Sequence, residues 1–203
     1  MKPLGDTLLI ATHNAGKLEE FAQLFAPRGI TCKSNADFNL PEPEETENTF
    51  LGNARIKARA AVAATGLPAL ADDSGIEIDG LNGRPGVHTA DWAETPGGRD
   101  FGLAMSRAHR ELIEAGAPRP WTARFRATLV MLWPDGHEAV FEGRAEGTLT
   151  WPIRGATGHG YDPMFVPDGQ RLTFAEMTAE AKNAMSHRAD ALRKLIHALE
   201  TET

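Results

Sequence analysis

The chain has 203 residues, with 28 acidic and 21 basic side chains and a formal net charge of −7. This length fits a single domain spanning residues 1–203, built as two lobes, whose core needs no disulfide or structural metal. An acidic balance argues against nucleic acid as a partner, and the single cysteine, Cys32, excludes an intrachain disulfide. No apolar run approaches the ~20 residues of a membrane helix, so we expect a cytoplasmic protein without membrane contacts.

Strand and helix patterns follow one another along the whole chain. Residues 7–12 read as a buried strand, and the apolar spacing from Leu18 to Phe25 predicts a helix. Further strands are expected at residues 30–34, 69–71, 76–78, 123–133 and 138–150, with a turn at 72–75. Helices are expected at residues 50–65 and 99–115 and at the C-terminal end, where Leu192, Leu195, Ile196 and Leu199 form an apolar stripe. The sequence therefore predicts an α/β fold with helices packed on a central sheet.

A phosphate-binding pattern stands where the first strand passes into the first helix. The segment reads Thr12-His13-Asn14-Ala15-Gly16-Lys17. A helix N-terminus presents unpaired N–H groups to an anion, Gly16 would allow close approach, and Lys17 adds a charge. The alternative is a plain connection in which Asn14 caps the helix.

Two carboxylate groups lie far apart in the sequence. Asp72 and Asp73 follow a buried strand, and Glu42, Glu44, Glu45 and Glu47 crowd an acidic loop. Mg²⁺ is commonly held by one or two carboxylates and substrate phosphate oxygens. The alternatives are an Asx turn at residues 72–75 and a solvated acidic loop.

Two more segments in the C-terminal half carry candidate nucleotide contacts. In His159-Gly160-Tyr161-Asp162-Pro163, an aromatic ring suits a base and a carboxylate suits base N–H groups, although a structural turn with a packed Tyr161 is equally consistent. Ser186 is a natural N-cap, and it places the basic His187 and Arg188 in the first helical turn, where the dipole disfavours them. An electronegative ligand would compensate for that placement, and the alternative is a surface helix start with exposed basic side chains.

Together these segments resemble the inosine/xanthosine triphosphate pyrophosphatase family. The matching pieces, in order, are THNAGK at 12–17, EETENTFLGNARIKA at 44–58, ADDSG at 71–75, RPGVHTA at 84–90, HGYDP at 159–163 and SHR at 186–188. The resemblance implies a long mixed sheet whose flanking helices form two lobes around a central cleft. It also implies a homodimer that requires Mg²⁺ and hydrolyses ITP, dITP and XTP to the monophosphate and pyrophosphate.

The resemblance also implies roles for individual residues. Glu44, Glu45 and Asp73 would hold Mg²⁺, and Asp73 would accept the proton of the attacking water. Substrate contacts would come from the phosphate loop, Lys57, Ser74, the 159–162 loop and the basic C-terminal residues: Thr12, His13, Asn14, Ala15, Gly16, Lys17, Lys57, Ser74, His159, Gly160, Tyr161, Asp162, Lys182, His187 and Arg188.

This chain departs from the family pattern at several of these positions. The family often has Gly in place of His13 and Phe in place of His159, and it commonly has Gly and Glu where this chain has Glu47 and Gly52. These changes bear on base affinity and leave the reaction class as expected. Two other readings stay open: a pyrophosphatase for modified pyrimidine triphosphates, and a nucleotide-binding module without catalysis.

Overall fold

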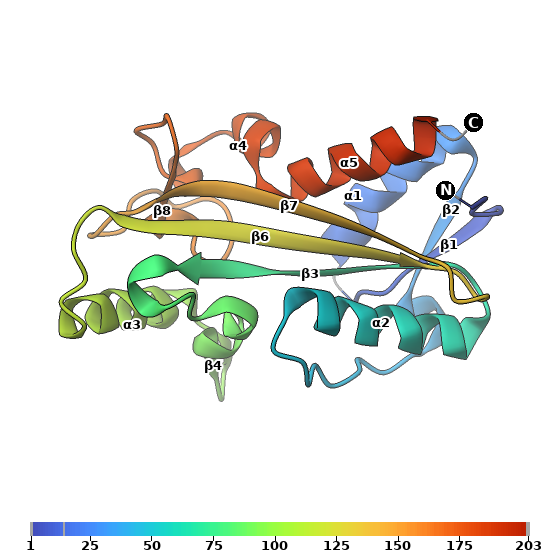
Figure 1. The fold of residues 1–203 in the computed structure, drawn as a ribbon, viewed down its shortest axis with the longest axis horizontal. Coiled ribbons are helices and arrows are strands. Elements are labelled where there is room, and N and C mark those ends of the chain that lie inside the picture. Colours follow the sequence, from blue (N-terminus) through green and yellow to red (C-terminus); the bar gives the residue numbers. More distant parts are fainter. Residues whose placement is uncertain (1, 14, 202–203) are drawn as a thin grey trace. The chain divides into compact units, whose positions relative to one another are not determined.

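The computed structural model describes residues 2–13 and 15–201, and it is an α/β protein with a mixed sheet (Figure 1). Six strands form the main sheet in the order β2-β1-β3-β6-β7-β8. They are β1 (Thr7–Ile10), β2 (Thr31–Ser34), β3 (Ala69–Ile78), β6 (Trp121–Leu132), β7 (Glu138–Leu149) and β8 (Phe165–Pro167). β1 pairs in parallel with β2 and β3, whereas β7 and β8 are antiparallel. The predicted fold class is confirmed.

Besides short 3₁₀ helices and loops, the described part of the chain contains five α-helices and a small hairpin. The helices are α1 (Ala15–Phe25), α2 (Phe50–Thr65), α3 (Phe101–Glu114), α4 (Ala179–Met185) and α5 (His187–Thr201), and the hairpin pairs β4 (Glu94–Thr95) with β5 (Gly98–Arg99). No helix within residues 2–13 and 15–201 is long and apolar enough to cross a membrane.

The chain divides into two compact units, and three strands contribute to both. Unit 1 comprises Met1–Asp73, Thr128–Glu142 and Lys194–Thr203, and unit 2 comprises Ser74–Ala127 and Gly143–Arg193. The boundaries therefore fall inside β3, β6, β7 and α5. The predicted cleft between the two lobes stays a prediction.

Unit 1 is built on small side chains. Its core joins Leu9 of β1, Val130 of β6 and an alanine face of α2 made of Ala54, Ala58 and Ala61. Alanine brings the helix backbone close to the sheet at little entropic cost. Thr49 caps α2 by accepting a hydrogen bond from the Gly52 N–H at 3.0 Å, and Gly66 ends the helix in the left-handed region at φ 67°. These signals place Lys57 in the middle of α2.

Unit 2 has an aromatic core. β6 alternates buried Trp121, Ala123 and Phe125 with more exposed residues between them, as a strand with one covered face should. Phe165 and Phe174 are fully buried in the same core. Asp100 caps α3 by accepting from the N–H groups of Gly102 and Leu103.

The predicted turn at residues 72–75 is wrong, because Ala69–Ile78 is a single strand. Asp, Asp, Ser and Gly favour a turn when considered locally. In the folded chain, lysine partners offset the burial of both carboxylates, and the strand continues through them. Tertiary pairing thus overrides the local preference. The structure also adds β8, which the sequence analysis does not predict.

Candidate active site

Lys57 lies between two of the predicted metal ligands in unit 1. Its Nζ is 2.8 Å from Glu45 Oε1 and 3.1 Å from Asp73 Oδ1. Lys57 comes from α2, Asp73 from β3 and Glu45 from the acidic loop, so three separate segments meet at one ammonium group. Glu44 is exposed on the same loop. The acidic loop and the Asp-Asp pair, which the sequence keeps far apart, are therefore brought together.

Asp72 has a different lysine partner. Lys17 Nζ, from α1, is 2.7 Å from Asp72 Oδ2. Successive side chains of a strand point to opposite faces, so Asp72 and Asp73 can each meet a lysine from a different helix. We call Lys17, Glu45, Lys57, Asp72 and Asp73 the carboxylate–lysine cluster.

The phosphate loop contacts the acidic loop directly. His13 Nε2 is 2.8 Å from the carbonyl oxygen of Leu40, and α1 begins at Ala15. Asn14 lies outside the described residues, so its predicted capping role stays a prediction. Thr12 is half-buried and lies two residues beyond the end of β1, and the helix start at Ala15 agrees with the predicted strand-to-helix passage.

Burial and neighbouring charges shift the proton affinities of Asp73 and Lys57. Burial raises the pKa of Asp73 to about 6, opposed by Lys57 and reinforced by the negative charges of Glu45 and Asp72. Burial alone would lower the pKa of Lys57, but Asp73, Glu45 and Asp72 together raise it. Asp73 therefore changes charge near neutral pH, which suits a proton acceptor, whereas Lys57 stays cationic.

The cluster suits a magnesium ion that shares its ligands with a substrate. Within residues 2–13 and 15–201, no group of three or more His, Cys, Asp or Glu side chains is arranged to hold a metal by itself. Mg²⁺ needs fewer, because it commonly keeps several waters and binds one or two carboxylates plus phosphate oxygens. Asp73 Oδ2 is buried and has no hydrogen-bond partner among the residues that the structure describes. A buried carboxylate oxygen in that state is a suitable ligand atom, and Glu45 lies across Lys57 from it.

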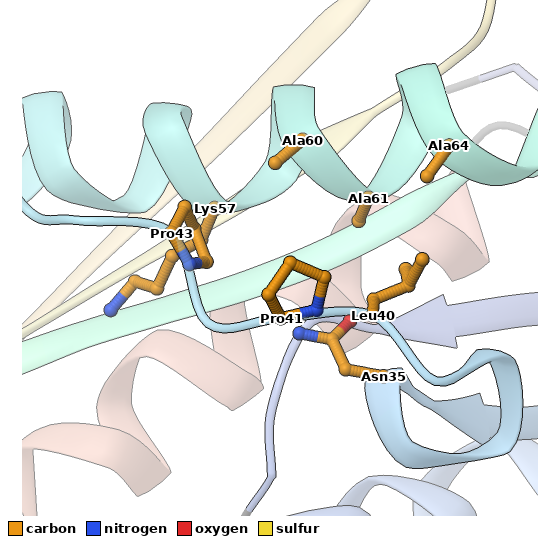
Figure 2. A pocket seen from close by; sticks show the side chains of 8 residues that line it. All are labelled: Asn35, Leu40, Pro41, Pro43, Lys57, Ala60, Ala61 and Ala64. Atoms are coloured by element: carbon orange, nitrogen blue, oxygen red, sulfur yellow. The ribbon is translucent and has the colours of Figure 1, made fainter.

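A small, mainly apolar pocket adjoins this cluster (Figure 2). It has a volume of about 180 Å³ and lies between the start of the acidic loop and α2. Its lining residues are Asn35, Leu40, Pro41, Pro43, Lys57, Ala60, Ala61 and Ala64. In Figure 2, Lys57 leaves α2 beside Pro43 of the acidic loop, so the loop and the lysine border the same space.

In unit 2, the 159–162 loop is organised around a buried carboxylate. Asp162 Oδ2 accepts a hydrogen bond from the His159 N–H at 2.6 Å and also pairs with Lys182 Nζ. Asp162 is 2% exposed. Gly158, at φ 82°, leaves the space that this carboxylate occupies, since a Cβ there would lie 2.3 Å from Asp162 Oδ2. Asp162 and Lys182, both predicted nucleotide contacts, thus form one ion pair.

The aromatic ring of this loop that faces solvent is His159, not Tyr161. Tyr161 is fully buried and packs edge-on against Phe101 with ring centroids 6.1 Å apart. Burial raises the pKa of its hydroxyl. The structure thus agrees with the alternative in which Tyr161 is a packed core residue. Any contact of Tyr161 with a ligand in this conformation would come from its backbone.

Ser186 begins α5 as the sequence predicts. Its Oγ accepts from the Ala189 N–H at 3.2 Å, which places His187 and Arg188 in the first turn. The His187 ring stacks on Phe125, with centroids 4.9 Å apart and an angle of 14° between the planes. Sequence reasoning missed this contact. The alternation of β6 indicates that Phe125 is buried, but it carries no information about which ring lies against it.

Comparison with known proteins identifies the family. The model of the Ham1 family matches residues 8–198. The chain belongs to the Ham1 family. A dITP/XTP pyrophosphatase from Ruegeria pomeroyi is 66% identical over 192 residues, covering 95% of this chain and 94% of the relative. A dITP/XTP pyrophosphatase from Rhodospirillum centenum is 55% identical, again covering 95% of this chain and 94% of the relative.

Solved structures agree with this assignment. The HAM1 protein from Coxiella burnetii superposes with a TM-score of 0.90 at 36% identity, covering 97% of this chain and 99% of that one. A nucleoside-triphosphatase / dITP/XTP pyrophosphatase from Mycobacterium abscessus superposes with a TM-score of 0.77 at 39% identity. The match covers 93% of this chain and 98% of that one. The resemblance drawn from the six sequence motifs is confirmed for the family and the fold.

Proposed function

We propose that this protein hydrolyses the non-standard purine nucleoside triphosphates ITP, dITP and XTP to the monophosphate and pyrophosphate, and so cleanses the nucleotide pool. The observation that carries the proposal is the 66% identity, over nearly the whole of both chains, to a protein named dITP/XTP pyrophosphatase. The carboxylate–lysine cluster supplies chemistry that fits this hydrolase activity, because it combines a proton acceptor with two ammonium groups.

Asp73 is the proposed proton acceptor for the attacking water. With its pKa raised to about 6, it is mostly ionised at neutral pH but remains basic enough to take a proton. Lys57 holds one oxygen of this carboxylate, which leaves Oδ2 for the water or the metal. Lys17, at the start of α1, would offset charge on the departing pyrophosphate.

Mg²⁺ is the proposed cofactor, held by Asp73 and Glu45 with Glu44 as a further candidate. When bound, it would neutralise triphosphate charge and favour ionisation of a water molecule. The phosphate loop from Thr12 to Lys17 is the proposed binding segment for the triphosphate. We further propose a homodimer located in the cytoplasm.

Selection among purines is assigned to unit 2. Hypoxanthine and xanthine carry an oxygen acceptor at position 6, whereas adenine carries an amino donor. Arg188 and Lys182 are donors only, so the 6-amino group of adenine would offer them no acceptor, and such mismatches can discriminate by several orders of magnitude. Ser74, His159 and His187 complete the proposed contacts.

A pyrophosphate-release assay with ITP, dITP, XTP, GTP, ATP and dTTP tests the proposal. We expect turnover of the first three in Mg²⁺, its loss in EDTA, and recovery when Mg²⁺ is restored. Full activity in EDTA would contradict the metal requirement. Preference for modified pyrimidine triphosphates, or ITP binding without pyrophosphate release, would instead support one of the two other readings of the sequence.

A further inference from the structure

Two phenylalanines in unit 2 connect two of the proposed nucleotide contacts. Phe125, on β6, stacks against His187 at 4.9 Å and lies nearly parallel to Phe174, with centroids 6.0 Å apart and planes at 25°. Lys182 Nζ lies 5.6 Å from the centre of the Phe174 ring. These contacts form a chain of neighbouring side chains that runs from His187 through Phe125 and Phe174 to Lys182. We call the two central rings the Phe125–Phe174 stack.

The backbone of His187 is held as closely as its side chain. A Cβ on Gly143 of β7 would lie 2.0 Å from the His187 carbonyl oxygen and 2.4 Å from the Ala191 nitrogen. The first turn of α5 thus rests on the backbone of β7. The Arg144 N–H donates to Asp190 Oδ2 in the same turn, at 3.3 Å. With the backbone fixed in this way, the ring of Phe125 lies against one face of the imidazole.

Lys182 is held from two sides as well. Its ammonium group pairs with the buried Asp162 and lies within cation–π range of Phe174. Phe174 is fully buried and belongs to a short helical turn whose own capping box, Thr173 with Glu176, is complete. A well-fixed ring at this place restricts a side chain that otherwise has four rotatable bonds.

We propose that Phe125 and Phe174 are positioning residues that orient His187 and Lys182 toward the purine base and thereby set base selectivity. This inference rests on the proposed function, because it takes His187 and Lys182 to contact the nucleotide. The rings act only through those two side chains. Losing the stack should therefore change how strongly ITP is preferred over ATP more than it changes turnover of ATP.

The first measurement needs no substrate. A ring stacked on Phe125 experiences its ring current, so the imidazole proton resonances of His187, assigned by their loss in His187→Ala, should be displaced upfield in the wild-type NMR spectrum. Phe125→Leu should abolish that displacement. An undisplaced His187 signal in the wild-type protein would overturn the inference whatever the enzyme does.

The second measurement compares kcat/KM for ITP and ATP in Phe125→Leu and in Phe25→Leu. Phe25 is the control, since it is fully buried but belongs to α1 in unit 1. Aromatic pairing energies correspond to about 2- to 10-fold, so Phe125→Leu should lower the ITP/ATP ratio by that factor. Phe25→Leu should lower Tm but leave the ratio unchanged.

A double mutant separates the positioning role of Phe125 from the proposed contact between His187 and the nucleotide. If Phe125 acts through His187, Phe125→Leu should have no further effect on the ITP/ATP ratio in a His187→Ala background. Additive effects, or equal loss of selectivity in Phe25→Leu, would overturn the inference. If His187→Ala alone leaves the ratio unchanged, the proposed role of His187 fails instead. Should Phe125→Leu not fold, Phe125→Met removes the ring with less loss of volume and replaces it in every comparison.

Discussion

Asp72 and Asp73 are adjacent and buried, and each forms an ion pair with a lysine from a different helix. Two neighbouring carboxylates in a strand are costly unless each has a compensating charge. Lys17 and Lys57 provide that charge, and the compensation at Asp73 is incomplete, because burial still raises its pKa to about 6. Asp73 is thus held in a state that favours proton uptake, which is the property a general base needs.

Replacing Asp73 with Asn should lower the rate of ITP turnover by at least ~10²-fold, the lower range for loss of a general base. The amide keeps the shape of the side chain but accepts no proton at neutral pH. Steady-state pyrophosphate release measures the effect. Asp168→Asn, at an exposed position after β8, serves as the control and should retain full activity. A folded Asp73→Asn protein with wild-type turnover would refute the role.

The raised pKa of Asp73 also predicts a pH-dependent stability in metal-free protein. The unfolded chain releases this proton near pH 4 and the folded chain only near pH 6, so wild-type stability falls as pH rises between them. Asn has no proton to lose. The free energy of unfolding of Asp73→Asn, measured relative to that of the wild type, should therefore rise by up to about 3 kcal/mol from pH 4 to pH 7. Urea unfolding in EDTA measures this difference, and a constant difference across that range would disagree with the burial of Asp73.

At the scale of elements, three separate contacts hold the start of α5 in unit 2. Ser186 caps it, the Arg144 N–H bonds to Asp190 in its first turn, and Gly143 permits its backbone to touch β7. His187 and Arg188, which the helix dipole disfavours at this place, therefore lie in a turn whose backbone is fixed by Ser186 and by contacts with β7.

Gly143→Ala should destabilise the protein by about 1–3 kcal/mol, since the added methyl group meets the backbone of α5 and cannot be accommodated by a side-chain rotation. The ITP/ATP selectivity should fall with it, because His187 moves. Thermal melting and kcat/KM measure the two effects. Gly97→Ala is the matched control: its nearest atom would be 3.9 Å away, so it should change neither.

At the scale of the whole molecule, three strands and one helix contribute to both compact units. Neither unit has a complete sheet of its own, because β3, β6 and β7 each supply residues on both sides of a boundary. A unit that unfolded alone would break strands that the other requires. We therefore expect the two units to unfold together.

Trp133→Phe tests this expectation. The remaining tryptophans, Trp92, Trp121 and Trp151, all belong to unit 2, so fluorescence then reports on that unit while far-UV circular dichroism reports on the whole chain. Coincident denaturation midpoints are the expected outcome. A fluorescence midpoint separated from the circular dichroism midpoint would show that unit 2 unfolds independently. Trp92→Phe, which keeps Trp133, is the comparison variant.

Local patterns in the sequence were enough for the parts of this protein that depend on neighbours along the chain. Helical spacing and capping residues predicted α2 and α3 to within about two residues, and Ser186 was correctly recognised as the N-cap of α5. The six motifs, through their resemblance to a known family, indicated the family and the fold. Such features depend on backbone propensity and spacing, which the sequence carries directly.

Only the tertiary structure decided which distant residues meet. It made residues 69–78 one strand despite a local turn signal, and it buried Tyr161 while leaving His159 exposed. It also brought Lys57 between Glu45 and Asp73. These outcomes depend on the path of the chain between contacts, and on burial that only the completed sheet and helices provide. The pKa of Asp73 belongs to the same class, because desolvation exists only once the protein has folded.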